Sequence, residues 1–352
     1  MKALKLAVLV LFAVGCAKDG NNSSTASSTS SVDLTGAGAT FPYPLYSKWF
    51  DEYAKLTGVK INYQSIGSGG GIRQLSEGTV DFGASDSPMS DAEMAKAKFG
   101  PILHIPTVLG AVAVTYNLPA MTLPIELTPQ AIADIFAGRI SKWNDARIAS
   151  LNPGVSLPAS DILVVHRSDG SGTTYIFTDY LTTAAPSWKS VGKGKEVNWP
   201  VGLGAKGNEG VAGQVKQTPG AIGYVELAYA KQNRLPIAAV KNKAGKFVVA
   251  SVPAVTAAAA GIAKTLPPNT DFRISVVDAP GPDAYPISSF TWILVYQHQR
   301  DSVKGKKLVG FLNWASSSGE HEAASLDYAP LPSEMGPIVK AQVATIGFAG
   351  AK

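Results

Sequence analysis

The chain has 352 residues, which is enough for one large domain or two medium ones. Its hydrophobic fraction of 45% and charged fraction of 16% are typical of a globular protein and argue against a disordered chain. The formal net charge of +5 comes without long basic runs, so nucleic-acid binding is not expected.

Cysteine and histidine usage gives no sign of a metal centre. Cys16 is the only cysteine, which excludes a disulfide within the chain and a cysteine-based metal site. The histidines lie far apart, without the spacing of metal ligands: His104, His166, His298 and His321. We therefore expect neither a metal nor another cofactor.

The N-terminus resembles an export signal over residues 1–15. Lys2 and Lys5 precede an apolar run over residues 6–14, which is shorter than the roughly 20 residues of a membrane-spanning helix. The sequence around Cys16 resembles a bacterial lipobox, although Ala13 stands where leucine is usual. Lipidation of Cys16 would anchor the chain to a membrane, and simple cleavage with an incidental cysteine is the alternative. Residues 16–33 then form a Ser- and Thr-rich flexible tether.

From residue 34 the chain alternates between expected strands and helices. The expected strands cover residues 34–41, 59–63 and 80–86, and helices are expected after residue 42, after the Gly-rich loop 65–71 and over 90–98. Leu45, Trp49 and Tyr53 fall on one face of the first of these helices. This alternation predicts an α/β fold with largely parallel strands.

Two β-rich segments, residues 105–116 and 290–296, bracket a central block that has its own strands and helices. This arrangement predicts two domains joined by two crossover segments. The discontinuous first domain would comprise residues 34–108 and 288–352, and the second residues 109–287. A single large α/β domain remains an alternative on pattern alone.

A strand followed by a polar loop and a helix is expected around residues 162–181. Ser171, Gly172 and Thr173 fall in the first turn of that helix, where backbone N–H groups lack intrahelical partners and carry the positive end of the dipole. Small residues let an anion approach this backbone, and the planar fork of Arg167 suits an oxyanion. The pattern indicates an anion site, with an ordinary capped helix as the alternative.

Similar helix openings occur at Thr40-Phe41 and at Ser68-Gly69. Each offers a hydroxyl or a free backbone donor after a strand, and parallel sheets place such loops at one edge, where ligands bind. The templates for enzymes fit poorly, because the chain lacks an NTPase phosphate loop and the glycine that a nucleophile elbow needs two residues before Ser171. No catalytic residue is expected.

Several segments closely resemble the phosphate-binding proteins of bacterial phosphate-specific ABC transporters. These segments are residues 34–42, 80–86, 141–145, 167–173 and 219–225, and the likeness covers essentially all of residues 34–340. The resemblance implies a two-lobed binding protein that closes over inorganic phosphate and delivers it to a membrane ABC permease. It implies a monomer in the periplasm or on the outer face of a bacterial membrane.

The resemblance also implies which residues contact phosphate. They are Thr40, Phe41 through its N–H, Ser68, Asp86, Arg167, Ser171, Gly172 and Thr173, with Asp169 holding the arginine. An ionised Asp86 can only accept hydrogen bonds, so it would select an anion that carries a proton, such as phosphate, over sulfate. Two alternatives remain: a secreted phosphate-ester hydrolase with Ser171 as nucleophile, and the same fold binding another oxyanion such as sulfate.

Overall fold

The computed structural model describes residues 34–119, 121, 124–263, 266–267 and 270–349. The expected export signal, the lipidation of Cys16 and the tether through residue 33 lie outside the described residues. Within the described part of the chain, every helix is too short or too polar to cross a bilayer.

The first elements follow the expected order. They are β1 (Leu34–Gly38), α1 (Tyr43–Thr57), β2 (Ile61–Ser65), α2 (Ser68–Glu77), β3 (Phe82–Ser85) and α3 (Asp91–Met94). β1 pairs in parallel with β2 on one side and with β3 on the other. The expected helix over residues 90–98 is shorter than predicted, because α3 ends at Met94. Its start is fixed by a capping box in which Ser90 and Glu93 bond each other's backbone N–H.

Two long strands cross the middle of the molecule. β4 (Ile102–Tyr116) and β11 (Ser288–Tyr296) run antiparallel, and their register shifts between Thr291 and Trp292. From Val112 onward β4 pairs instead with β8 (Ala221–Glu226), and β8 lies parallel to β6 (Leu163–Arg167), which pairs with β7 (Leu203–Ala205). In the described residues the sheet therefore has the order β2-β1-β3-β11-β4-β8-β6-β7.

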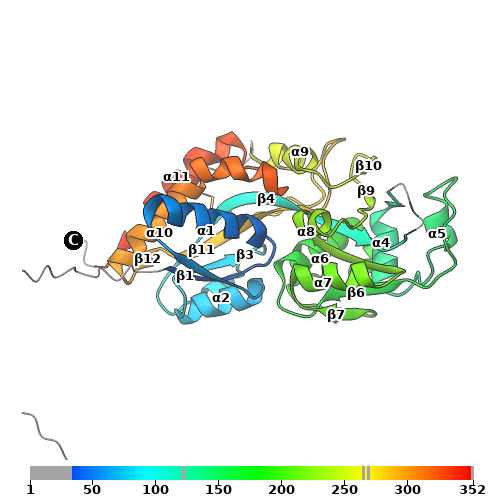
Figure 1. Ribbon diagram of the computed structural model, residues 1–352, viewed down its shortest axis with the longest axis horizontal. Helices are drawn as coiled ribbons and strands as arrows, with labels where there is room; N and C mark the ends of the chain where they lie inside the picture. The colour runs from blue at the N-terminus through cyan, green and yellow to red at the C-terminus, as the bar shows by residue number, and fades with distance from the viewer. Residues whose placement is uncertain (1–33, 120, 122–123, 264–265, 268–269, 350–352) are drawn as a thin grey trace, which may run out of the picture. The chain divides into compact units, whose positions relative to one another are not determined.

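This sheet defines two lobes (Figure 1). The first lobe is built on β2, β1, β3, β11 and the first part of β4, and the second on the last part of β4 with β8, β6 and β7. The expectation of largely parallel strands is wrong at the centre of the sheet. There the chain leaves the first lobe along β4 and returns along β11, so these strands run in opposite directions.

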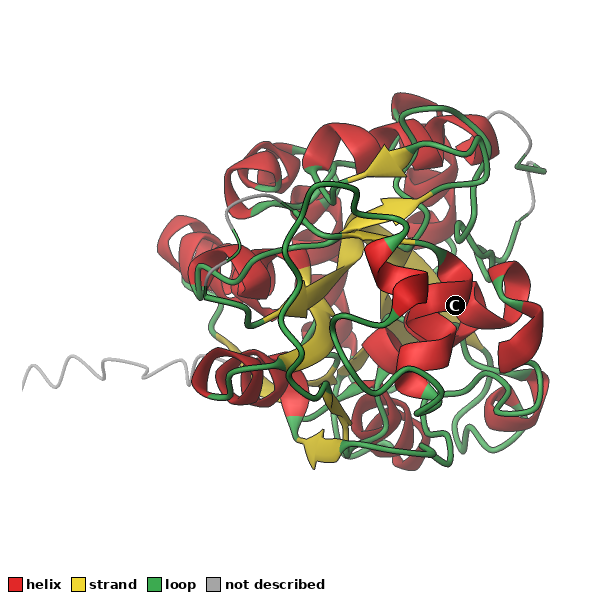
Figure 2. Ribbon diagram, turned by 90° about the vertical axis from the view of Figure 1, so that its right-hand side faces the viewer, coloured by secondary structure: helices red, strands yellow, loops and turns green. Residues whose placement is uncertain are grey.

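The remaining elements surround this sheet, with helices on its flanks (Figure 2). The helices are α4 (Pro129–Phe136), α5 (Ala146–Ala149), α6 (Gly172–Ala184), α7 (Gly207–Gln217), α8 (Leu227–Gln232), α9 (Val252–Ala263), α10 (Ser302–Ala315) and α11 (Gly336–Ala344), with short 3₁₀ helices at Pro186–Trp188, Ser318–Glu322, Ala324–Leu326 and Ser333–Met335. The small strands are β5 (Glu126–Leu127), β9 (Ala239–Lys241), β10 (Phe247–Val248), β12 (His298–Gln299) and β13 (Gly347–Phe348).

Close packing holds two helices, α2 and α6, against strands of the sheet. At Gly71 in α2, an added Cβ would lie 2.5 Å from the carbonyl oxygen of Ala37, so glycine lets this helix rest directly on β1. In the second lobe, the ring of Phe177 in α6 stacks on Tyr224 of β8 at a centroid distance of 4.3 Å. Both helices are therefore packed closely against strands of their own lobes.

Candidate functional site

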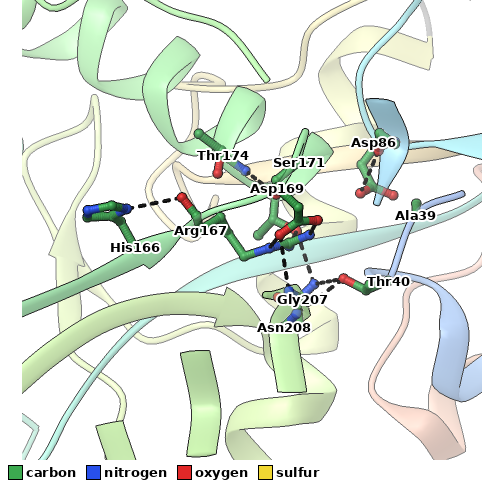
Figure 3. A network of polar contacts seen from close by, with 12 residues as sticks. Ala39, Thr40, Asp86, His166, Arg167, Asp169, Ser171, Thr174, Gly207 and Asn208 are labelled. Carbon is green, nitrogen blue, oxygen red and sulfur yellow. Dashed lines mark hydrogen bonds and ion pairs between the residues drawn. The ribbon is translucent and has the colours of Figure 1, made fainter. Parts of the chain in front are cut away.

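The residues predicted to form an anion site come together where several strands end. Thr40 and Phe41 follow β1, Asp86 follows β3, Arg167 ends β6, and the starts of α2 and α6 supply the others. Each has at most 4% of its surface exposed: Thr40, Phe41, Ser68, Asp86, Arg167, Ser171 and Thr173. The two lobes thus enclose a buried polar cluster (Figure 3).

Arg167 is the cation of this cluster, and Asp169 fixes its orientation. Arg167 Nε lies 2.7 Å from Asp169 Oδ1, and Nη2 lies 2.5 Å from Oδ2, which makes a two-pronged ion pair. The Gly207 N–H adds a hydrogen bond of 3.1 Å to Oδ1. Burial alone would raise the pKa of Asp169, but the hydrogen bonds and charge of Arg167 hold it below its usual range. The pair is therefore charged and rigid.

The start of α6 presents small residues to the first lobe. Ser171 is the N-cap, and its Oγ accepts a hydrogen bond of 3.0 Å from the Thr174 N–H. An added Cβ at Gly172 would lie 2.4 Å from Ser68 Oγ and 2.6 Å from Asp86 Oδ2. The first turn of α6 therefore touches the start of α2 and the end of β3 across the boundary between the lobes.

His166 is not placed to activate Ser171. Its Nδ1 lies 3.0 Å from the carbonyl oxygen of Arg167, and its ring stacks on Trp199 at a centroid distance of 4.9 Å. In Figure 3 the imidazole points away from Ser171. The arrangement gives Ser171 a helix-capping role and lacks the histidine base of a serine hydrolase at its hydroxyl.

Asp86 is a buried carboxyl group with few partners. Its Oδ1 accepts a hydrogen bond of 2.8 Å from Thr291 Oγ1, and Ser68 Oγ lies 3.5 Å from Oδ2. Burial raises the pKa of Asp86 to about 7, although Thr291 and the charge of Arg167 act in the opposite direction. Near neutral pH the carboxyl group can therefore hold a proton, which differs from the fully ionised form expected from the sequence.

Sequence reasoning missed a set of residues that support the cluster. The N–H and the side-chain amide of Asn208, at the start of α7, donate to Thr40 Oγ1 at 3.2 and 2.7 Å. The hydroxyls of Tyr229 and Tyr328 donate to the carbonyl oxygens of Thr40 and Phe41, both at 2.6 Å. The signal for Asn208 was available, because the loop after β7 is another Gly-containing helix opening.

Further contacts join the lobes around the cluster. The Gly69 N–H donates to the Gly170 carbonyl oxygen at 2.8 Å, and Glu93 of α3 forms an ion pair of 2.7 Å with Lys195. The lobes are therefore in contact on several sides of the cluster. In the described part of the chain, no group of three His, Cys, Asp or Glu side chains could hold a metal ion.

Comparison with known proteins gives consistent similarities. The model of the PBP superfamily domain matches residues 23–318. The chain is 45% identical over 329 residues to the phosphate-binding protein PstS of Xylella fastidiosa, covering 91% of this chain and 88% of that one. It is also 45% identical, over 322 residues, to the phosphate-binding protein PstS of Pasteurella multocida, covering 91% of this chain and 92% of that one.

Solved structures share the fold. A high-affinity periplasmic phosphate-binding protein solved with phosphate bound superposes with a TM-score of 0.71 at 22% identity, covering 90% of this chain and 93% of that one. A phosphate-binding protein from Stenotrophomonas maltophilia gives the same TM-score and identity, with 88% and 93% covered. The two-lobed α/β architecture is thus the one these proteins have.

Proposed function

This chain belongs to the PstS family of phosphate-binding proteins within the PBP superfamily, and we propose that it captures inorganic phosphate for import. The observation that carries the proposal is that Arg167, the first turn of α6 and the hydroxyl groups of the first lobe lie together in one buried polar cluster. Such a cluster offers many hydrogen-bond donors and little net charge, because Asp169 neutralises Arg167. This suits a small tetrahedral anion held mainly by dipoles.

The proposed contacts are those expected from the resemblance. Arg167 supplies charge-assisted hydrogen bonds, the N–H groups of Phe41, Gly172 and Thr173 cover other oxygens, and hydroxyl groups complete the shell. The complete proposed set is Thr40, Phe41, Ser68, Asp86, Arg167, Ser171, Gly172 and Thr173. Asp169 acts behind Arg167 by fixing the direction of its fork.

Asp86 is proposed to select a protonated anion. A carboxyl group with a pKa of about 7 can share one proton with monohydrogen or dihydrogen phosphate. Sulfate carries no proton at neutral pH, so only the protonated form of Asp86 could donate to it, and the ionised form, which predominates above pH 7, would face it without a hydrogen bond. Because the pKa of Asp86 is about 7, this selection against sulfate should strengthen as the pH rises above 7 and the ionised form takes over. The alternative of a sulfate-binding site is therefore disfavoured.

Binding is proposed to favour closure of the lobes. The proposed contacts come from both lobes, so a bound anion gains all of them only when the lobes meet, and it shifts the population toward that state. We place the lobe boundaries at residues 34–108 with 288–352, and 109–287. This boundary is supported by the change of partner along β4 between Ala111 and Val112.

The location and partners complete the proposal. Lipidation of Cys16 would hold a monomer at the outer face of a bacterial membrane or in the periplasm, beside the ABC permease that receives phosphate. Membrane fractionation of a Cys16→Ser variant tests the anchor. Retention of the variant in the membrane fraction, at the level of the parent chain, would contradict it. We propose no catalytic role, because His166 bonds the carbonyl oxygen of Arg167 and does not contact the Ser171 hydroxyl.

Equilibrium calorimetry with phosphate, arsenate and sulfate tests the function. We expect phosphate to bind, arsenate to compete because it too is protonated near neutral pH, and sulfate to fail. Arg167→Ala should weaken phosphate binding by at least ~1.5 kcal/mol, the scale of a hydrogen bond to a charged group. Binding of sulfate in place of phosphate, or hydrolysis of a phosphate monoester at an enzymatic rate, would refute the proposal.

A further inference from the structure

Asn208 links two hydroxyl groups that belong to different lobes. Its N–H and its Nδ2 donate to Thr40 Oγ1 of the first lobe at 3.2 and 2.7 Å, and Nδ2 also donates to Thr173 Oγ1 of the second lobe at 3.1 Å. The side chain is fully buried, and its Oδ1 accepts the Glu226 N–H at 2.8 Å. This last contact fixes which end of the amide faces the hydroxyls, so the donors point into the site (Figure 3).

The hydroxyl groups are saturated as acceptors. A hydroxyl has one proton to donate and two lone pairs to accept with. Both lone pairs of Thr40 Oγ1 are taken by Asn208, and those of Thr173 Oγ1 are taken by Asn208 and by Arg167 Nη1 at 3.3 Å. Within the described residues, neither hydroxyl donates to another protein atom. Each can therefore offer only its proton to whatever lies between the lobes.

We propose that Asn208 is a positioning residue that turns Thr40 and Thr173 into obligate donors toward the bound anion. An anion's oxygens accept and do not donate, apart from a protonated one, so hydroxyls already locked as donors need no reorientation when it arrives. Such preorganisation strengthens binding to negative charge inside a water-free site. Because one hydroxyl belongs to each lobe, Asn208 also completes its contacts only when the lobes meet. This inference rests on the proposed phosphate function.

The neighbouring residue supports the same design. The Gly207 N–H donates to Asp169 Oδ1, so the first turn of α7 orients the carboxylate that holds Arg167 as well as the two hydroxyls. Gly207 has a φ of +73°, in the left-handed region where other residues are strained, which aims its N–H at that carboxylate. Gly207 and Asn208 of α7 thus orient both kinds of donor: Gly207 acts on the charged one through Asp169, and Asn208 acts on the two neutral hydroxyl groups.

The test is a cycle of variants measured for phosphate affinity by calorimetry on the purified protein. Asn208→Ala should weaken phosphate binding about 10- to 100-fold in the parent chain, the range of hydrogen bonds to charged groups. In a chain that already carries both Thr40→Val and Thr173→Val, adding Asn208→Ala should change phosphate affinity less than about threefold, because no hydroxyl remains to be oriented. If the Asn208 and threonine substitutions acted independently, their fold-losses of phosphate affinity would instead multiply, to within about twofold. That result would overturn the inference.

A matched control is Gln214→Ala at the far end of α7, where the amide donates to Thr218 Oγ1 at 3.0 Å. It should leave phosphate affinity unchanged. If Asn208→Ala does not fold, Asn208→Leu keeps the volume, removes the same donors and enters the same cycle. A parent chain that binds no phosphate refutes the proposed function itself, whereas normal binding by both Asn208 variants refutes only the role of Asn208.

Discussion

The ammonium group of Lys195 lies 2.7 Å from the carboxylate of Glu93, and this ion pair joins the second lobe to the first. Glu93 uses its other oxygen to close the capping box of α3, so the partner of Lys195 is held in place before the lobes meet. Burial alone would raise the pKa of Glu93, but Lys195 and the backbone N–H of Ser90 lower it. Glu93 is therefore ionised at neutral pH, and its ion pair with Lys195 stabilises the closed arrangement of the lobes.

Removing this pair should speed phosphate release. Both side chains are about one-fifth exposed (20% and 24%), so the pair is worth at most about 1 kcal/mol. Lys195→Met should raise the release rate up to about fivefold in stopped-flow experiments, with little change in the association rate. The increase should shrink as salt is added, because salt already weakens the pair in the parent chain.

The control for this experiment is Lys142→Met. Lys142 forms an ion pair of 2.8 Å with Asp161 within the second lobe, so its loss should leave release unchanged. Equal acceleration in both variants would mean that overall charge, and not the contact between lobes, sets the release rate.

Asp86→Asn should weaken discrimination against sulfate. At pH 8 the carboxyl group of Asp86 is mostly ionised and repels an unprotonated anion, whereas the amide can donate a hydrogen bond, so sulfate should compete with phosphate at least about 10-fold better than in the parent chain. Competition calorimetry in both anions measures this. Asp179→Asn, another buried acid that accepts from Ser275, is the control and should keep the original preference. Unchanged selectivity in Asp86→Asn would remove Asp86 from the proposed role.

The buried carboxyl of Asp86 should also make stability depend on pH. Its pKa is raised from 3.8 to about 7, so between about pH 4 and 7 the folded chain holds a proton that the unfolded chain has lost. The free energy of unfolding should therefore fall as pH rises through this window. At about 1.4 kcal/mol per pKa unit, the contribution lost between pH 5 and 8 is about 2–3 kcal/mol.

Urea unfolding without phosphate at pH 5 and pH 8 checks this prediction, which applies to the arrangement in which Asp86 stays buried between the lobes. Burial also raises the pKa of Glu226 and of Glu320, so Asp86→Asn should remove only part of the pH dependence. A pH dependence as steep in Asp86→Asn as in the parent chain would show that Asp86 does not titrate in this range.

Gly172→Ala should act as a wedge between the lobes. The new Cβ would lie 2.4 Å from Ser68 Oγ and 2.6 Å from Asp86 Oδ2, closer than atoms tolerate, so the lobes could not meet fully. Phosphate affinity should fall about 5- to 150-fold, on the scale of a clash in a packed core. The unfolding temperature without phosphate should change little, because an open state relieves the contact. Gly213→Ala, with nothing within 4 Å of the new Cβ, is the control. Parent-like affinity in Gly172→Ala would contradict this packing.

Much of the first lobe could be predicted from local sequence. β1 and α1 follow from an apolar run, a Gly-rich turn and prolines at a helix start, all of which act over a few residues. The start of α6 was equally readable, because a capping serine precedes a helical apolar pattern. The resemblance to a known family then indicated which of these openings share one site.

Features that depend on distant residues could not be read this way. The antiparallel pairing of β4 with β11 joins strands more than 170 residues apart, and strand periodicity carries no information about partner or direction. The raised pKa of Asp86 follows from burial by both lobes, which only the folded chain reveals. The Gly-containing opening of α7 is visible in the sequence, but the bonds of Asn208 to Thr40 and Thr173 join residues far apart in the chain and appear only in the fold.

The pairing of β11 with β4 shifts register between Thr291 and Trp292, where β4 carries Thr107 as an extra residue, and Thr291 is the residue that donates to Asp86. An irregularity of this kind bends a strand and re-aims its side chains. The irregular pairing therefore helps to set the direction in which β11 presents the hydroxyl group that holds the Asp86 carboxyl group. A deletion in β4 that restored a regular ladder would therefore turn Thr291 away from Asp86 and change the surroundings of a buried acid from the far side of the strand pair.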